Sequence, residues 1–177
     1  MKSVPNVSGL TGGVMFSASL RERAAAVIAL YEERGLTLVT AESCTGGLIA
    51  GLMTETPGSS KVFERGFVTY SNRSKEEALG VAPDLIDQFG AVSAEVASAM
   101  AEGALEHSAA TVALSVTGIA GPDGGTAAKP VGLVYFGYGR AGQMATLKKK
   151  FGDIGRSEVR LASVETALDL LLNVALF

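Results

Sequence analysis

The sequence is poor in the residue types that several functional classes require. Its 177 residues include one cysteine and one histidine, which excludes a disulfide framework and a standard zinc site built from these residues. Tryptophan is absent and aromatic residues make up 6%, so an aromatic surface for stacking nucleic-acid bases is not expected. Fifteen basic and 18 acidic side chains give a net charge of −3. That charge provides no global attraction to nucleic acids or anionic membranes.

Long hydrophobic runs are also missing, so the chain has neither a bilayer-spanning segment nor the apolar core of a secretory signal. Residues 1–17 are interrupted by Pro5 and several glycines, and we expect a flexible N-terminal extension there. Residues 18–177 are expected to form a single domain, in a cytoplasmic protein without a membrane partner. Apolar side chains are plentiful at 47%, which predicts a sizeable buried core.

Helical and strand-like segments alternate along the chain. Helices are expected over 17–34, 48–55, 74–79, 83–88, 93–107 and 156–173, with Ser17 or Ser19, Ser74 and Ser93 as N-caps. Strands are expected over 36–40, 66–70, 111–116, 131–138 and 144–151. This order predicts an α/β fold, a three-layer α/β/α sandwich with a mostly parallel sheet. The last two strands form a hairpin around 139–142, so the sheet should be mixed.

The segment after the first strand carries a dense set of reactive side chains. Ser43 and Cys44 precede Gly46 and Gly47 at the start of a helix, where unpaired N–H groups and the helix dipole favour negative charge. A hydroxyl or thiol in this turn is a candidate nucleophile, with those N–H groups as an oxyanion hole. In the simpler alternatives, Ser43 or Thr45 only caps the helix and Cys44 is an inert buried side chain.

A serine nucleophile needs a base, and the sequence offers few. His107, the only histidine, lies in the last turn of a predicted helix, so we interpret it as a surface residue. A lysine with a lowered pKa is the remaining candidate, and Lys75 follows Tyr70 closely after the second strand. The alternative for Lys75 is a solvated helix-surface charge, and Lys61 competes for the role of base.

A second corner follows the strand that ends near Val116. The glycine-rich loop from 117 to 125 suits a phosphate or sugar held by backbone N–H groups, although a purely structural turn cluster is equally open. It is not a Walker loop, because no Gly-Lys-Ser/Thr sequence ends it. Residues 137–142 match the dinucleotide fingerprint formally, but no helix follows them. The lysines at 148–150 are interpreted as a solvated edge strand that resists aggregation.

Five segments in order resemble the CinA C-terminal domain family: AESCTGG at 41–47, PGSS at 57–60, YSN and the following Lys75, GAVS at 90–93, and TGIAGPDGG at 117–125. The resemblance implies an amidase domain that converts nicotinamide mononucleotide and water to nicotinate mononucleotide and ammonia, in NAD recycling. It implies Ser43 as nucleophile and Lys75 as base, with Tyr70 nearby. With one histidine and one cysteine, no metal or redox cofactor is expected.

The substrate is expected to be held at both corners and by the last helix. Expected binding residues are Thr45, Gly46, Gly47, Thr117, Gly118, Gly121, Asp123 and Arg156. Arg156 would grip the phosphate beside a helix N-terminus, and Asp123 would accept from ribose hydroxyls. One alternative function is a non-catalytic nucleotide-binding module of the competence or damage-inducible type. Another is a serine or cysteine hydrolase for a different small amide. The alanine-rich helix at 93–107 fits either the core or a homo-oligomer interface.

Overall fold

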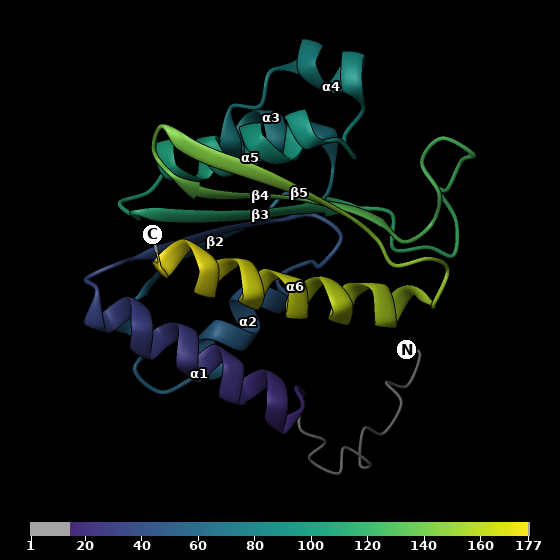
Figure 1. The fold of residues 1–177 in the computed structure, drawn as a ribbon. Helices are drawn as coiled ribbons and strands as arrows, with labels where there is room; N and C mark the ends of the chain where they lie inside the picture. The colour runs from purple at the N-terminus through teal and green to yellow at the C-terminus, as the bar shows by residue number, and fades with distance from the viewer. Residues whose placement is uncertain (1–14, 177) are drawn as a thin grey trace, which may run out of the picture.

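A computed structural model describes residues 15–176, and its elements form three layers (Figure 1). One face of a central sheet is covered by α1 (Ala18–Glu33), α2 (Leu48–Glu55) and α6 (Arg156–Leu176). The other face carries α5 (Ala94–Glu106), with α3 (Asn72–Leu79) and α4 (Pro83–Phe89) packed against it. A short 3₁₀ helix, η1 (Ser59–Lys61), precedes the second strand. The expected three-layer α/β/α sandwich is confirmed.

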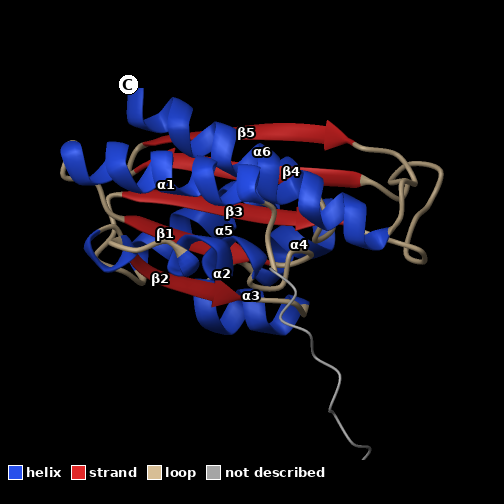
Figure 2. Cartoon of the chain, turned by 90° about the horizontal axis from the view of Figure 1, so that it is seen from below, coloured by secondary structure: helices blue, strands red, loops and turns tan. Residues whose placement is uncertain are grey.

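The sheet has five strands in the order β2-β1-β3-β4-β5 (Figure 2). β1 (Leu38–Glu42) is parallel to both neighbours, β2 (Phe63–Val68) and β3 (Val112–Gly118). β4 (Leu133–Arg140) is antiparallel to β3 and forms a hairpin with β5 (Gln143–Lys150). Because β4 alone runs against the others, the sheet is mixed and mostly parallel, as predicted.

The core is divided by the sheet into two clusters of buried side chains, one under each helical layer. β1 is buried along its whole length and β3 along nearly all of it, because helices cover both of their faces. β5 lies at an edge and is mostly exposed. The alanine-rich helix α5 belongs to the core, since Ala97, Ala101 and Ala104 are fully buried.

Helix caps agree with the sequence at two helices and differ at a third. The hydroxyls of Ser17 and Ser93 accept N–H bonds in the first turns of α1 and α5, as expected. The prediction that Ser74 caps α3 is wrong, because Ser71 accepts from the N–H of Ser74 and the helix begins at Asn72. The Ser74 hydroxyl instead donates to the Ser71 carbonyl from inside the first turn.

Strand boundaries also differ from the sequence-based expectation. β1 lies two residues later than 36–40, and β2 ends at Val68 instead of reaching Tyr70. The β1–β2 ladder ends where Glu42 pairs with Val68, so Tyr70 lies beyond the sheet. The hairpin turn contains only Ala141 and Gly142, not the four residues expected. A two-residue turn here places its glycine at φ 74°, a conformation that favours glycine.

Most of the expected N-terminal extension, residues 1–14, lies outside the described residues. Phe16, which is described, is buried in the core cluster shared by α1, α2 and α6. Within residues 15–176, the helices are all too short or too polar to cross a membrane. His107 ends α5 as an exposed residue, as interpreted from the sequence, with its Nδ1 2.8 Å from the Gly103 carbonyl.

Candidate active site

Ser43 occupies the corner between β1 and the turn that leads into α2. Its N–H donates to the Val116 carbonyl at 2.9 Å, which fixes it to the end of β3. Gly46 and Gly47 then reverse the chain with φ values of 60° and 93°, a region that other residues rarely adopt. The carboxyl ends of β1 and β3 therefore hold this serine at the edge where α/β proteins commonly place their sites.

Glu42 satisfies the N-terminus of α2 from inside the fold. Its carboxylate is fully buried and accepts N–H bonds from Gly47 and Ile49 at 3.1 Å and from Ala50 at 2.8 Å. The helix end is thus occupied by a protein carboxylate, and the Gly47 N–H is already paired. Sequence reasoning missed this residue, although an acidic side chain between a strand and a helix start is a recognisable signal.

Arg160 of α6 holds the residues that directly follow Ser43. Its guanidinium donates to the carbonyls of Cys44 at 3.1 Å and Thr45 at 2.9 Å. Among the described residues, the N–H groups of Cys44 and Thr45 have no acceptor; Cys44 is slightly exposed beside the serine, whereas Thr45 is fully buried. Sequence reasoning also missed Arg160, although it lies one helical turn after Arg156 and so shares its face of α6.

Lys75 is buried and contacts the serine directly. Its Nζ lies 3.1 Å from Ser43 Oγ and donates to the Thr69 carbonyl at 2.7 Å. The side chain is 1% exposed, and this burial lowers its pKa to about 8 because the charged form is poorly solvated. At that pKa, about a tenth of the amine is neutral at pH 7 and able to accept a proton.

The competing nucleophile and base lack these features. Cys44 is buried, and burial raises the pKa of its thiol to about 12, so the thiol is protonated at neutral pH. Lys61 lies at the surface, where it forms an ion pair with Glu32 of α1. The serine and lysine that contact each other are therefore Ser43 and Lys75.

A pocket of about 240 Å³ opens onto this pair. It is lined by Ser43, Cys44, Tyr70, Lys75, Ala91, Val92, Thr117, Gly118, Ile119, Ala120, Gly121, Asp123, Gly124 and Arg156. Most of the residues expected at the site are therefore together, whereas Thr45, Gly46 and Gly47 are outside the lining. Larger hollows surround the β4–β5 hairpin, but their lining contains no serine or lysine.

Tyr70 and Arg156 face each other at the pocket. Arg156 donates to the Tyr70 hydroxyl at 3.0 Å and to the Gly121 carbonyl at 2.8 Å. Tyr70 approaches Lys75 only through its backbone carbonyl, 3.4 Å from Nζ. A proton relay through the phenol would need the hydroxyl beside the amine, and the structure places it on the guanidinium instead.

The loop between β3 and β4 forms the other wall. Thr117 Oγ1 donates to the Ala91 carbonyl at 2.8 Å, and Lys129 Nζ donates to the carbonyls of Phe89 and Val92. These bonds fasten the end of β3 and the loop to the last residue of α4 and the segment that leads to α5. Within the described chain, the backbone N–H groups of four pocket-lining residues of this loop have no acceptor, those of Ala120, Gly121, Asp123 and Gly124. Sequence reasoning did not identify Lys129.

The pocket therefore combines a serine hydroxyl, a neutralisable amine, free backbone donors and one guanidinium. Asp123 is exposed at its rim and adds a single carboxylate. In the described part of the chain, no group of three histidine, cysteine or acidic side chains has the arrangement to hold a metal ion. Such an arrangement is suited to nucleophilic attack by serine on a small substrate that carries an anionic group.

Fold and site together define an α/β domain with a serine–lysine pair at the carboxyl edge of its sheet. The model of one family, the CinA C-terminal domain, matches residues 20–175. The chain belongs to this family.

Similar proteins differ in length. The nicotinamide-nucleotide amidohydrolase PncC of Enterobacter agglomerans is 49% identical over 160 residues, which cover 87% of this chain and 96% of that protein. A CinA-like protein of Geobacter sp. strain M21 is 49% identical over 93% of this chain, which spans only 40% of that protein. The match to the relative from Caldicellulosiruptor saccharolyticus likewise spans 40% of its length.

Solved structures resemble this fold closely. The competence/damage inducible protein CihA of Agrobacterium tumefaciens has a TM-score of 0.89 and 48% identity, covering 92% of this chain and 99% of that one. A CinA superfamily protein of Escherichia coli has a TM-score of 0.84 and 32% identity, covering 93% and 95%. The shared architecture extends over nearly the full length of both proteins.

Proposed function

We propose that this protein is a nicotinamide-nucleotide amidohydrolase, which converts nicotinamide mononucleotide and water to nicotinate mononucleotide and ammonia. The observation that carries the proposal is the 3.1 Å contact between the buried Lys75 amine and the Ser43 hydroxyl at a pocket. The amidohydrolase PncC of Enterobacter agglomerans, which this chain covers almost completely, supports the same substrate class.

In the proposed acylation step, neutral Lys75 takes the hydroxyl proton of Ser43 while Oγ attacks the carboxamide carbon. The resulting oxyanion is held by the free N–H group of Cys44, which lines the pocket. The Ser43 carbonyl of the same peptide unit accepts from the Gly46 N–H, and Arg160 holds the two carbonyls that follow it. The Lys75 ammonium then protonates the amide nitrogen, the carbon–nitrogen bond breaks, and ammonia leaves. The nicotinoyl group stays bound to Ser43 as an ester.

Water completes the reaction at the same two residues. Lys75, neutral again, accepts a proton from a water molecule as the water oxygen attacks the ester carbonyl. Collapse of this second intermediate returns the proton to Ser43 Oγ and releases nicotinate mononucleotide. Every proton is transferred by Lys75, so the proposal needs neither a metal ion nor a redox cofactor.

The nucleotide part of the substrate is proposed to lie against the β3–β4 loop and α6. Arg156 binds the phosphate, exchanging its present acceptors, the Gly121 carbonyl and Tyr70 hydroxyl, for phosphate oxygens. The unpaired N–H groups of the loop, including those of Gly121 and Gly124, add donors without adding charge. Asp123 accepts from the ribose, and Thr117 and Gly118 line the floor between the two ends.

The proposal is tested by ammonia release from nicotinamide mononucleotide with purified protein, measured together with the nucleotide product. Ser43→Ala removes the nucleophile and should lower turnover by several orders of magnitude. Cys44→Ala is the matched control, because it removes the neighbouring side chain and should retain most of the activity. Loss of activity in Cys44→Ala alone would overturn the serine assignment. Binding of the nucleotide by wild-type protein without ammonia release would favour the non-catalytic module.

A further inference from the structure

β5 is an edge strand whose outer side is unpaired within the described chain (Figure 2). The hairpin register pairs Arg140 with Gln143 across a two-residue turn, and Phe151 donates its N–H to the Gly132 carbonyl. In such a hairpin, odd-numbered residues of β5 direct their main-chain groups toward β4. Even-numbered residues from Met144 to Lys150 therefore direct theirs outward, where another strand can pair.

The side chains of β5 alternate between the two faces of the sheet. The Lys148 ammonium lies 5.5 Å from the centroid of the Tyr135 ring, its cross-strand neighbour. Tyr135 shares its face with Gly137, whose missing side chain makes room for the Ala97 carbonyl of α5. Lys148 and Lys150 consequently lie on the face covered by α5, and Lys149 lies on the face covered by α6.

Charge is divided between the two ends of this edge. At the start of β5, a hollow of about 510 Å³ is lined by Glu102 and Glu106 of α5 together with Leu105, Ala141, Gly142 and Met144. The glutamates are exposed, as are the three lysines at the other end of the strand. The α5 face of the edge is thus acidic at one end and basic at the other.

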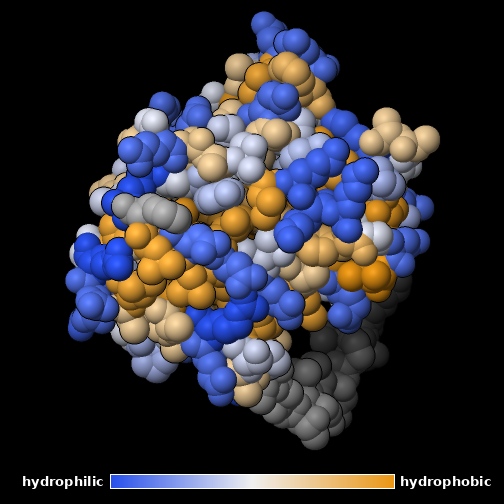
Figure 3. Space-filling view, in the orientation of Figure 1, coloured by the Kyte–Doolittle hydropathy of each residue, from blue (hydrophilic) through white to orange (hydrophobic). Residues whose placement is uncertain are grey.

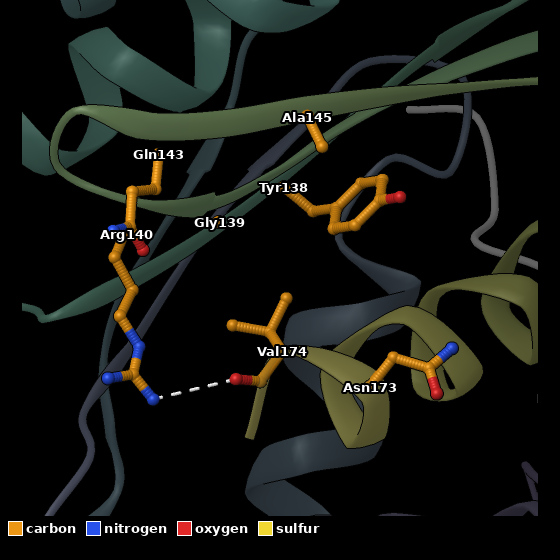
Figure 4. Close-up of a pocket in the computed structure, with 7 residues that line it drawn as sticks. All are labelled: Tyr138, Gly139, Arg140, Gln143, Ala145, Asn173 and Val174. Atoms are coloured by element: carbon orange, nitrogen blue, oxygen red, sulfur yellow. Dashed lines mark hydrogen bonds between the residues drawn. The ribbon is translucent and has the colours of Figure 1, made fainter. Parts of the chain in front are cut away.

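The α6 face of the same edge is more apolar. A hollow of about 480 Å³ lies between β5 and the end of α6, lined by Tyr138, Gly139, Arg140, Gln143, Ala145, Asn173 and Val174. Figure 4 shows the Tyr138 ring lying over this helix end, with Arg140 donating to the Val174 carbonyl. Apolar surface continues from β5 onto the C-terminal part of α6 in Figure 3.

We propose that two copies of this chain associate through β5, antiparallel about a twofold axis at Thr146. In this register Lys148 lies opposite Met144 of the second copy, and Lys150 lies opposite Gly142 of the second copy. Lys148 and Lys150 of each copy then reach the hollow lined by Glu102 and Glu106 of the other copy. The twofold axis repeats this contact, so it occurs twice in the dimer. The exposed apolar hollows on the α6 face are covered by the same association.

The lysine run selects this register over others. In a parallel, in-register arrangement, each lysine would lie beside the same lysine of the second copy. In an antiparallel arrangement centred on Lys148, the two copies of Lys148 would lie opposite each other. Among antiparallel registers, the basic end of one copy lies beside the acidic end of the other only when the twofold axis is closer to Met144 than Lys148 is. The lysines disfavour pairing of β5 with other strands in general, but they permit pairing in this one register. The proposal does not depend on the chemistry proposed for Ser43.

The first experiment measures the mass in solution by sedimentation across a concentration series. The wild-type chain is expected to dimerise, and Lys148→Glu with Lys150→Glu to weaken the dimer by about tenfold or more. Lys149→Glu is the matched control: it makes the same change on the other face and should leave the dimer intact. Mixing the double variant with Glu102→Lys, Glu106→Lys protein should restore association. A monomeric wild-type chain, or a double variant that dimerises normally, would overturn the proposal.

A second variant tests the main-chain pairing itself. Thr146→Pro removes an outward N–H at the proposed axis without removing a bond to β4, and should yield a folded monomer. Folding is verified by far-ultraviolet circular dichroism and thermal unfolding. A folded Thr146→Pro protein that still dimerises would contradict strand pairing at β5. If Thr146→Pro does not fold, the charge-reversal series decides alone, because its substitutions are at exposed side chains.

Discussion

As the proposed base, Lys75 must be buried to lose its proton easily, yet it must still reach the hydroxyl of Ser43. Its position in the first turn of α3 meets both needs, since Nζ contacts Ser43 while carbonyls of Thr69 and Tyr70 surround it. These carbonyls would stabilise an ammonium, but burial dominates and the pKa falls to about 8. The residue is therefore close to half-protonated in mildly alkaline solution.

This lowered pKa predicts the pH dependence of the proposed activity. The neutral amine is the active base, so kcat/KM should rise with pH and level off above an apparent pKa of about 8. Rates of ammonia release from pH 6 to pH 10 measure this limb. Lys75→Arg should be inactive throughout, because arginine stays protonated. A limb near pH 10, typical of a solvated lysine, would contradict the burial argument.

At this scale the sequence predicts the participants better than their contacts. Ser43 and Lys75 can be named as candidates because the single histidine is unsuited to be the base and both residues follow strand ends, and the family resemblance selects them over Cys44 and Lys61. Their 3.1 Å contact depends on how α3 packs, which no local pattern records. The Tyr70 hydroxyl illustrates the limit: its partner Arg156 is 86 positions away in the chain.

Among the elements, α2 depends on one carboxylate for its N-terminus. Glu42→Gln keeps the size of the side chain but turns an acceptor of three N–H bonds into a group that carries donors itself. We expect a loss of about 1–3 kcal/mol in the free energy of unfolding and a lower kcat, because the Ser43 turn loosens.

The control for this prediction is Glu95→Gln, which makes the same change at an exposed position in the first turn of α5. It should change the free energy of unfolding by less than about 0.5 kcal/mol. Denaturant unfolding and steady-state kinetics measure both effects. Equal stability of the two variants would show that the Glu42 carboxylate is not needed to hold the helix end.

Elements are predictable where local chemistry decides them. The caps at Ser17 and Ser93 follow from residue type, and β1 follows from a short buried run that contains β-branched residues. Boundaries at β1 and β2 are set by their ladder, in which Glu42 pairs with Val68. Because that pairing is between distant segments, the residues that leave the sheet toward the pocket cannot be located from the sequence alone.

For the whole molecule, the pocket joins segments from both helical layers and three strand ends. Arg156 supplies the contribution of α6, and Arg156→Ala should raise KM for nicotinamide mononucleotide by about tenfold or more with a smaller change in kcat. Nicotinamide riboside, which lacks the phosphate, should be turned over equally by both proteins. Equal losses with the two substrates would show that Arg156 serves the reaction in another way, such as fixing Tyr70.

The overall architecture is the part of the molecule that the sequence predicts most fully. Alternating elements and a late hairpin suffice for a mixed α/β/α sandwich, because each needs only local patterns and general packing rules. The grouping of Arg160 with the Ser43 turn, and of Lys129 with the α4–α5 segment, arises from tertiary packing. Local sequence patterns carry no information about such long-range hydrogen bonds.

The clamp of Arg160 on the Ser43 turn has a consequence for protein synthesis. α6 is the last element of the domain in sequence order, so Ser43 and Lys75 of a growing chain leave the ribosome well before Arg160 does. Until α6 docks, the carbonyls of Cys44 and Thr45 lack their guanidinium partner, and the neighbouring N–H groups are not fixed. A nascent chain therefore carries the proposed nucleophile and base early, but gains an ordered site only when translation of the domain is complete.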